Sequence, residues 1–377
     1  MNKKQNLSVW IIYLLLIMTL FSSCHVGRFF YWNFADVNDY KKFPAYKIKK
    51  ADEAFKFFEA KHQISFRIPD KFKNTDKEIS FDQFLIKHKT IAFLIIRNDT
   101  IIFEKYFKGY SKESIMPSFS VSKAFVSALT GIAIEDGFIK NTDQKVTEFL
   151  PELSKNGFDK VSIENLLNMR TGLKFSEVYL NPFAETGKFY YGRNLKKYVR
   201  KLKVKEIPGE KYEYQSGNTQ ILAEIIEKTS SKKLPDYLQE KIWKPIGMEY
   251  DASWNYDSKK SGMIKAFCCL NARARDFAKF GRLYLNNGNW NGKQIVPADW
   301  IARSTSVIND SKDSQDYSYT YQWRVIGNGC FFAKGLLGQY IYVDPVKNLI
   351  FLRFGESYAK TDWADLFLCL SKQIESK

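Results

Sequence analysis

Histidine is scarce in this chain of 377 residues, and its three histidines, His25, His62 and His88, all precede residue 90. A Ser-His-Asp triad or a histidine-rich metal site would have to draw on this short stretch, which makes both poor candidates. The sequence also lacks a P-loop, a GxGxxG dinucleotide fingerprint and cysteine pairs at zinc-site spacing. We therefore expect no metal, no organic cofactor, and a catalytic base other than imidazole.

Cysteine is scarce as well, with five residues in total, so the composition is not that of a disulfide-stapled scaffold. Adjacent cysteines such as Cys268 and Cys269 rarely bridge each other, and the sequence leaves open whether these two, Cys330 and Cys369 form pairs. With 45% hydrophobic and 26% charged residues the chain is globular, and it is long enough for one large domain or two of average size.

Acidic residues are outnumbered, and the net charge of +17 raises the question of a nucleic-acid or anionic-membrane partner. The lysines are scattered, and the dense basic stretch covers residues 196–205. We expect this stretch to be the solvated face of a helix. A rival interpretation is a basic surface that binds membranes or nucleic acid. Aromatic residues are not interleaved there in a pattern for base stacking, so we expect no nucleic-acid partner.

Residues 1–24 have the pattern of a targeting segment, with two lysines, an apolar run over residues 9–21, two serines and then Cys24. The apolar run is shorter than the roughly 20 residues that a transmembrane helix needs. The pattern resembles a bacterial lipoprotein signal, in which Cys24 becomes the lipidated first residue, although Phe21 is bulky for its position. The alternative is an uncleaved N-terminal anchor. Either way we expect an exported, membrane-anchored protein that faces the periplasm or the cell exterior.

Residues 25–77 are rich in aromatic residues and lysine without a clear period. We interpret them as a linker and N-terminal extension that packs on the main domain, residues 78–377. Apolar, β-branched runs at 91–96 and 101–106 flank a polar turn and predict a β-hairpin. Apolar periodicity predicts the remaining elements, which are helices at 121–139, 163–169, 219–229, 274–285 and 362–377, and strands at 341–343 and 349–354. This order predicts an α+β fold. Its N- and C-terminal strands share one antiparallel sheet flanked by helices, and a mostly helical region is inserted between them.

Ser120 and Lys123 stand three residues apart where a long apolar helix is predicted to begin. At this spacing both side chains lie on one face of the helix, within reach of each other. A serine hydroxyl needs a neighbour that takes its proton, and a buried lysine can do so as the neutral amine. The backbone N–H of Ser120 is free at the helix start to stabilise an oxyanion. Taken alone, the pattern is equally typical of an N-cap serine, and Ser230 and Lys233 repeat it near a predicted helix end.

Three further segments add to this pattern: residues 208–216 ahead of a predicted helix, residues 272–283, and residues 335–339 leading into a predicted strand. Together with Ser120 and Lys123 they resemble the penicillin-recognising serine hydrolases, which include class C β-lactamases, D,D-peptidases and related esterases. The resemblance extends from about residue 84 to the C-terminus. Tyr214-Gln215-Ser216 is similar to the Tyr-x-Ser of the branch named for 6-aminohexanoate-dimer hydrolase.

The resemblance implies a β-lactamase/penicillin-binding-protein-like fold and a serine hydrolase that acts on an amide or ester through an acyl-enzyme intermediate. Ser120 would be the nucleophile, Lys123 the base, and Tyr214 the group that relays protons and protonates the leaving group. The N–H groups of Ser120 and Leu336 would form the oxyanion hole. The residues that would line the substrate cleft are Ser216, Gly335, Glu177 and Tyr179.

Two departures from the superfamily pattern bear on these roles. The cation two residues before Gly335 is replaced by Ala333, and Lys334 would face the other way on a strand, which argues against an efficient β-lactamase or D,D-peptidase. Residues 216–218 can also be interpreted as a Ser-x-Asn motif, which would move the proton relay to Ser216. We favour Tyr214, because it follows a Pro-Gly pair at the superfamily's spacing. The alternative function is a catalytically inactive, penicillin-binding-like protein that binds cell-wall peptides, and the oligomeric state is open.

Overall fold

The computed structural model describes residues 10, 13, 25–32, 34–73 and 79–374 of the chain. The predicted signal segment, including the lipidation candidate Cys24, lies outside the described residues apart from Trp10 and Tyr13. Among the described residues, no helix combines the length and the apolar character that crossing a bilayer requires.

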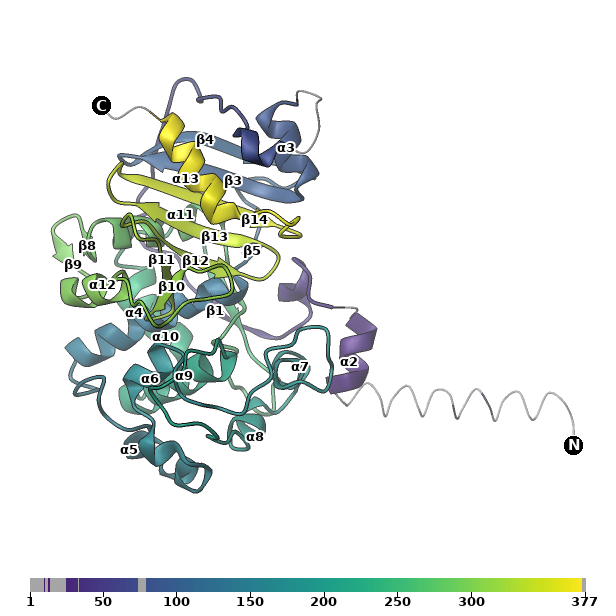
Figure 1. The fold of residues 1–377 in the computed structure, drawn as a ribbon, viewed down its shortest axis with the longest axis vertical. Coiled ribbons are helices and arrows are strands. Elements are labelled where there is room, and N and C mark those ends of the chain that lie inside the picture. The colour runs from purple at the N-terminus through teal and green to yellow at the C-terminus, as the bar shows by residue number, and fades with distance from the viewer. Residues whose placement is uncertain (1–9, 11–12, 14–24, 33, 74–78, 375–377) are drawn as a thin grey trace, which may run out of the picture.

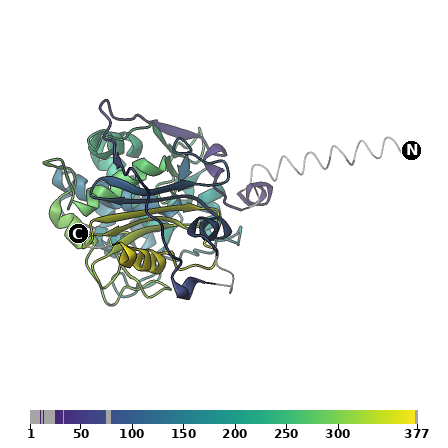
Figure 2. The ribbon, with the colours of Figure 1, turned by 90° about the horizontal axis from the view of Figure 1, so that it is seen from above.

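A large sheet of eight strands forms the upper part of the molecule in Figure 1. From edge to edge its order is β10 (Ser318–Thr320), β11 (Trp323–Val325), β12 (Phe331–Gly335), β13 (Gln339–Asp344), β14 (Leu349–Gly355), β3 (Thr90–Arg97), β4 (Thr100–Tyr106) and β2 (Phe58–Glu59). β14 pairs antiparallel with β3, and Figure 2 shows these yellow and blue strands side by side. The prediction of an antiparallel sheet shared by N- and C-terminal strands is confirmed, and β2 is added at one edge parallel to β4.

β3 and β4 form the predicted hairpin. Asn98 and Asp99 at its turn have φ angles of 47° and 59°, the left-handed pair that a two-residue type I′ turn requires. Residues 91–96 of β3 are all buried, because the sheet is covered on both faces. The apolar run that predicted this strand is therefore continuous rather than alternating.

Four helices cover the large sheet, with α3 (Phe81–Lys87) and α13 (Trp363–Gln373) on one face, and α11 (Ala274–Leu285) backed by α4 (Ser122–Glu135) on the other. Gly281 of α11 permits close approach to β14, because a Cβ there would lie 2.8 Å from a methyl carbon of Ile350. On the far side of α11, Phe280 stacks on Phe125 of α4 with 3.7 Å between ring centroids. The long helix that begins near Ser120 is thus fixed to the sheet through α11.

Most of the chain between β5 (Met116–Pro117) and β6 (Ala252–Asn255) is helical and forms the lower part of Figure 1. Besides α4, its helices are α5 (Val146–Phe149), α6 (Ile163–Leu167), α7 (Glu185–Tyr191), α8 (Leu195–Val199), α9 (Ser216–Ser230) and α10 (Leu234–Leu238). The predicted helices are present with shifted ends: α4 stops before Gly137, whose φ is 77°, and α9 begins at Ser216 rather than at residue 219. The short helices α5, α7 and α10 were not predicted. The earlier start of α9 brings residue 216 to a helix N-terminus.

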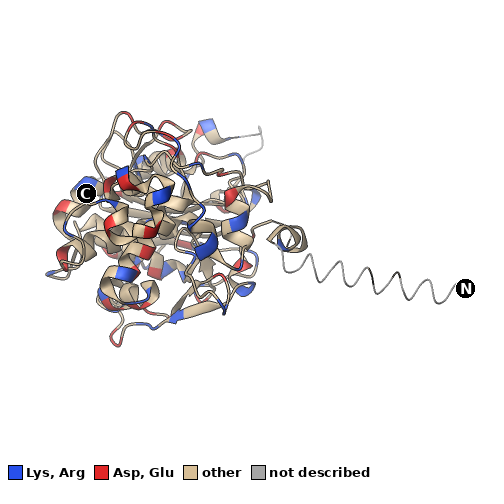
Figure 3. Ribbon diagram, turned by 90° about the horizontal axis from the view of Figure 1, so that it is seen from below, with Lys and Arg blue, Asp and Glu red and all other residues tan. Residues whose placement is uncertain are grey.

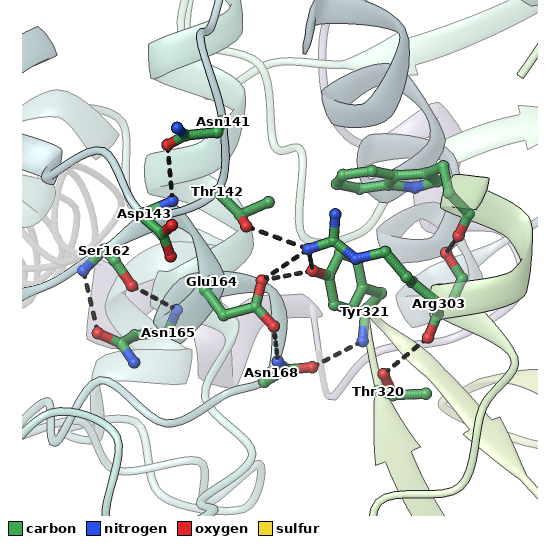
Figure 4. A network of polar contacts seen from close by, with 12 residues as sticks. Asn141, Thr142, Asp143, Ser162, Glu164, Asn165, Asn168, Arg303, Thr320 and Tyr321 are labelled. Carbon is green, nitrogen blue, oxygen red and sulfur yellow. Dashed lines mark hydrogen bonds and ion pairs between the residues drawn. The ribbon is translucent and has the colours of Figure 1, made fainter. Parts of the chain in front are cut away.

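Figure 4 shows a polar network that joins the helical region to the edge of the large sheet. Arg303 of α12 (Ala298–Ser304) donates to Thr142 Oγ1 at 3.1 Å and pairs with Glu164 of α6 at 3.3 Å. The hydroxyl of Tyr321, which follows β10, also binds Glu164, and its backbone N–H donates to Asn168 Oδ1 at 3.0 Å. These contacts fix the two parts of the molecule relative to each other.

A second, smaller sheet has the strand order β1 (Ala45–Ile48), β6, β7 (Leu270–Ala272) and β5, and a two-stranded hairpin is formed by β8 (Asn289–Trp290) and β9 (Lys293–Gln294). Through β1 the small sheet includes the N-terminal extension. The helix α2 (His25–Trp32) of the same extension packs on α7. Strands of two to four residues leave little periodicity in the sequence, and none of the six strands in these two small sheets was predicted.

Basic and acidic residues are interspersed over the molecule, as Figure 3 shows for the face seen from below. In the basic stretch 196–205, Arg200 pairs with Glu152 at 2.7 Å and also with Glu224. Apolar side chains of the same stretch are buried against the helical region. Residues 196–199 of the stretch lie in α8 and the rest is turn and extended chain, so the predicted helix face covers only its first part. Part of the charge of the stretch is neutralised within the chain.

Candidate active site

Ser120 is held at a sharp junction between the small sheet and α4. The backbone N–H of Ser118 donates to Leu270 O at 2.8 Å, which continues the pairing of β5 with β7. Phe119 follows with a φ of 43°, a left-handed conformation that an aromatic residue rarely adopts. Burial of its side chain, which is 3% exposed, holds this conformation in place. The kink carries Ser120 into a 3₁₀ turn, Phe119–Val121, directly before α4.

Lys123 lies one helical turn after Ser120 and is 1% exposed. Its Nζ is 3.0 Å from Ser120 Oγ and 2.8 Å from the backbone oxygen of Phe267. Burial lowers the pKa of Lys123 to about 7; nearby Glu177 raises it and Arg324 lowers it further. Near neutral pH a large fraction of this amine is therefore unprotonated, and it faces the serine hydroxyl.

Tyr214 lines the same pocket as Ser120. Lys123 Nζ is 5.0 Å from its ring centroid, and its phenol is close enough to Ser120 for the serine to lower its pKa. Burial raises the pKa of Tyr214, and Glu177 adds to this, while Arg324 and Ser120 lower it. The net direction is upward, so the phenol is protonated at neutral pH. Of the two groups beside Ser120, the lysine is thus suited to be the base and the tyrosine to be an acid.

Ser216 points toward Glu177 at the N-terminus of α9. Its backbone N–H donates to Glu177 Oε2 at 2.8 Å and its hydroxyl donates to Oε1 at 2.7 Å. The hydroxyl of Tyr179 donates to the same Oε1 at 2.8 Å. A carboxylate is favourable at the positive end of a helix dipole. Because the Ser216 proton is engaged by Glu177, this geometry favours Tyr214 over Ser216 as the proton relay.

Gly335 brings the end of β12 against the turn that carries Ser120. A Cβ on this residue would lie 2.4 Å from Ser118 O and 3.2 Å from the backbone nitrogen of Ser120, so only glycine fits. Leu336 follows at the start of the turn between β12 and β13. It lines both of the pockets that Ser120 lines. The backbones of the two predicted oxyanion-hole residues are thus brought together.

Lys334 corrects one prediction. Ala333 points into the core beneath the sheet, as alternation requires, but Lys334 lines the same pocket as Ser120 rather than facing away from it. Its ammonium reaches Gln315 Oε1, because the lysine stem is long and β12 ends at the rim of the pocket. Burial, reinforced by Arg324, lowers the pKa of Lys334 to about 8.

Arg324 of β11 was not found from the sequence. Its guanidinium carbon is 5.5 Å from the Tyr214 ring centroid, and its Nε donates to Asp313 Oδ2 at 2.5 Å. No motif marks it, because it reaches the site through the register of β11 with β12. The alternation of aromatic and polar residues from 317 to 325 is the signal that could have predicted β10 and β11.

A disulfide joins the adjacent residues Cys268 and Cys269, contrary to the expectation that neighbours rarely bridge. Cys269 has a φ of 73°, and this left-handed backbone turns the two side chains toward each other. The disulfide directly follows Phe267, whose carbonyl binds Lys123. Cys330 and Cys369 are free thiols.

Two pockets of opposite character meet at Ser120. The first, called here the apolar pocket, has a volume of about 160 Å³, and its walls include Phe34, Leu180, Tyr190 and Phe267. The second, called here the polar pocket, has a volume of about 350 Å³ and is bordered by Tyr214 and by four charged residues, Glu177, Asp313, Arg324 and Lys334. Ser120, Tyr179 and Leu336 line both. In the described part of the chain, no cluster of three or more His, Cys, Asp or Glu residues is arranged to hold a metal ion.

The chain is similar in sequence and in fold to known proteins. The family model described as Beta-lactamase matches residues 81–356. The 6-aminohexanoate-dimer hydrolase of Paenarthrobacter ureafaciens is 27% identical over 277 residues, which cover 68% of this chain and 70% of that protein. The D-aminopeptidase of Brucella anthropi is 27% identical over 144 residues, 38% of this chain and 27% of that protein. A solved Bacillus anthracis structure named for 6-aminohexanoate-dimer hydrolase has a TM-score of 0.79 at 23% identity and covers 91% of this chain and 93% of that one.

The family model spans most of the chain, and the similar solved structure shows the same fold. The predicted α+β, β-lactamase/penicillin-binding-protein-like fold is confirmed. The chain belongs to the Beta-lactamase family, and it is a serine hydrolase similar to 6-aminohexanoate-dimer hydrolase.

Proposed function

We propose that this protein hydrolyses an amide or ester through an acyl-enzyme on Ser120. The observation that carries the proposal is a buried amine, Lys123 Nζ, 3.0 Å from Ser120 Oγ, with a pKa lowered to about 7. A nucleophilic serine requires a base within hydrogen-bond reach whose pKa is close to the working pH. This pair meets both requirements without histidine.

In the first half-reaction the neutral amine of Lys123 takes the proton of Ser120. The Oγ–carbon bond forms, and the electron pair of the substrate carbonyl moves onto its oxygen. The N–H groups of Ser120 and Leu336 would stabilise that oxyanion, an interaction for which one donor is typically worth about 100–1000-fold in rate. The bond to the leaving group then breaks as Tyr214 gives it a proton, and the lysine proton restores the phenol.

In the second half-reaction a water molecule gives a proton to Lys123 and attacks the acyl carbon. The carbon–Oγ bond breaks, Ser120 regains its proton, and the carboxylic acid leaves. The amide substrates named for the similar 6-aminohexanoate-dimer hydrolase and D-aminopeptidase support an amide or peptide-like substrate here. We further propose that residues 1–24 direct export and that lipid on Cys24 holds the protein on a membrane.

The test is the Ser120→Ala variant with p-nitrophenyl acetate as substrate. We expect kcat/KM to fall at least about 1000-fold while the thermal unfolding curve is retained. Ser230→Ala is the matched control, because Ser230 and Lys233 repeat the Ser-x-x-Lys spacing away from the site, and it should stay active. Unchanged turnover in Ser120→Ala would remove the serine from this role.

A fluorophosphonate probe separates the proposal from the alternative of an inactive cell-wall-peptide binder. An active enzyme gains mass at Ser120, whereas the inactive alternative predicts no gain. Labelling of wild type and of Ser230→Ala, but not of Ser120→Ala, is the expected result.

A further inference from the structure

The two pockets that meet at Ser120 fix the direction in which a substrate lies. Tyr214 borders the polar pocket, and in the proposed mechanism it must reach the leaving group to protonate it. The leaving group therefore occupies the polar pocket, and the acyl group extends into the apolar pocket on the other side of Ser120. The oxyanion donors Ser120 and Leu336 stand between them, since both residues line both pockets.

The apolar pocket is lined by aromatic and aliphatic side chains with few polar groups. Among the described residues that line it, none carries a formal charge. The tyrosines in its wall stay neutral, because burial raises the pKa of Tyr179, Tyr190 and Tyr191. An unpaired ionic group in such a site would lose its hydration without compensation. The pocket therefore suits an uncharged acyl chain.

One wall of this pocket comes from the N-terminal extension, through Phe34 and Ala35. The extension is fastened to α7, which forms the adjacent wall. Arg28 Nε donates to Tyr191 O at 2.6 Å, and the hydroxyl of Tyr190 donates to Asp39 Oδ2 at 2.6 Å. The wall is thus a fixed part of the fold, and it is built by residues that precede the stretch matched by the family model.

The size of the pocket sets the length of the acyl chain. Its volume of about 160 Å³ is close to that of an engineered protein cavity of about 150 Å³ that binds benzene, a ring of six carbons. Two of the side chains that line the pocket are exposed and form its rim, with Phe34 44% and Leu180 75% exposed. Carbons past the sixth would reach this rim and gain less from burial.

We infer that the protein is selective for substrates with an uncharged, apolar acyl group of about six carbons, and that Phe34 and Ala35 set this selectivity. The inference rests on the proposed function and adds the substrate class to it. Each buried methylene is worth about fourfold in binding, so four more methylenes from acetyl to hexanoyl give at most ~200-fold in kcat/KM.

The experiment measures kcat/KM for p-nitrophenyl esters from acetyl to decanoyl, and for the 6-aminohexanoyl ester, which adds an ammonium to a hexanoyl chain. We expect kcat/KM to rise at least about tenfold from acetyl to hexanoyl and then to level off. The 6-aminohexanoyl ester should react at least about tenfold more slowly than the hexanoyl ester. A flat series, or a preference for the ammonium-bearing ester, overturns the inference.

Two variants tie the selectivity to the N-terminal wall. Ala35→Trp fills the pocket and should move the optimum to shorter chains, and Phe34→Ala should flatten the rise toward hexanoyl. Phe58→Ala is the matched control, an exposed phenylalanine on β2 at the far edge of the large sheet, and should leave the profile unchanged. An unchanged profile in both wall variants, with wild-type melting curves, overturns the assignment. If ester hydrolysis requires Ser120 but kcat/KM does not depend on acyl-chain length, this inference alone is wrong. If hydrolysis persists in Ser120→Ala, the proposed function is wrong.

Discussion

The lowered pKa of Lys123 predicts the pH dependence of catalysis. The base must be unprotonated to act, so kcat/KM should rise with pH along a limb of unit slope whose midpoint is about 7. At one pH unit below the midpoint about one-tenth of the amine is neutral, and at one unit above it about nine-tenths is. The rise should not be followed by an early fall, because the pKa of Tyr214 is raised above its ordinary value.

Two substitutions shift this midpoint in opposite directions. Arg324 lowers the pKa of Lys123, so Arg324→Gln should move the limb to higher pH, and the carboxylate of Asp313 left without its partner acts in the same direction. Glu177 raises the pKa of Lys123, so Glu177→Gln should move the limb to lower pH. The two variants control for each other. General damage to the site would lower kcat/KM in both without moving the pH midpoint in opposite directions.

The assay follows kcat/KM for p-nitrophenyl acetate between pH 5 and 10 at constant ionic strength, with thermal melts at both ends of the range. A limb centred near 10, the ordinary range of lysine, would show that Ser120 is activated by another group. Shifts of the same sign in Arg324→Gln and Glu177→Gln would show that the midpoint does not belong to Lys123.

Three further predictions concern stability and the architecture of the site. Lys123→Met should raise the free energy of unfolding below pH 7 by as much as about 5 kcal/mol, since lowering the lysine pKa from 10.5 to about 7 costs about 1.4 kcal/mol per unit. The folded lysine is neutral above pH 7 and the unfolded one above about pH 10. The gain should therefore shrink across that interval in urea titrations, and a gain independent of pH would contradict it. Gly335→Ala should lower kcat/KM at least about 100-fold, because its Cβ would displace the backbone beside Ser120, whereas Gly327→Ala, where a Cβ meets open space, should be silent in the same ester assay. Reducing the Cys268–Cys269 disulfide with a phosphine should lower kcat/KM several-fold and reversibly, because the carbonyl of Phe267, the residue before the disulfide, holds Lys123. Thiol titration measures the extent of reduction, and full turnover of the reduced protein would contradict this prediction.

The sequence predicts the fold where its elements are long and strongly patterned. The hairpin at 91–96 and 101–106, α11 and the pair of strands before the last helix all follow from apolar periodicity, and β14 joins β3 as the element order predicts. Strands of two or three residues, such as β5 and β7, are shorter than the period that would reveal them. Their existence depends on pairing between distant segments, which no local pattern records.

In the candidate site, too, contacts between residues close in sequence are predictable and contacts between distant segments are not. Ser120 and Lys123 are neighbours in the sequence, so a helical spacing predicts their contact. Arg324 reaches Tyr214 through strand register, and Phe34 reaches the apolar pocket through the packing of α2 and α7. Lys334 was expected to face away, because alternation fixes the direction in which a Cβ points but not where a flexible stem of four carbons places its ammonium.

The charges around Tyr214 bear on the departure of this chain from the superfamily motif. Ala333 stands where a cation is usual, yet two cations, Arg324 and Lys334, border the same pocket from β11 and β12. Arg324 lowers the pKa of Lys123 and that of Tyr214 alike. One effect favours the neutral amine and the other makes the phenol a better proton donor, so both act in the direction that the proposed acyl transfer requires. The guanidinium of Arg324 is hydrogen-bonded to Asp313, so Arg324 influences Lys123 and Tyr214 through its electrostatic field. Lys334 brings a second positive charge to the polar pocket, where the leaving group would lie. A positive charge beside the pocket can thus come from the neighbouring strand β11 when the usual cation is replaced by Ala333.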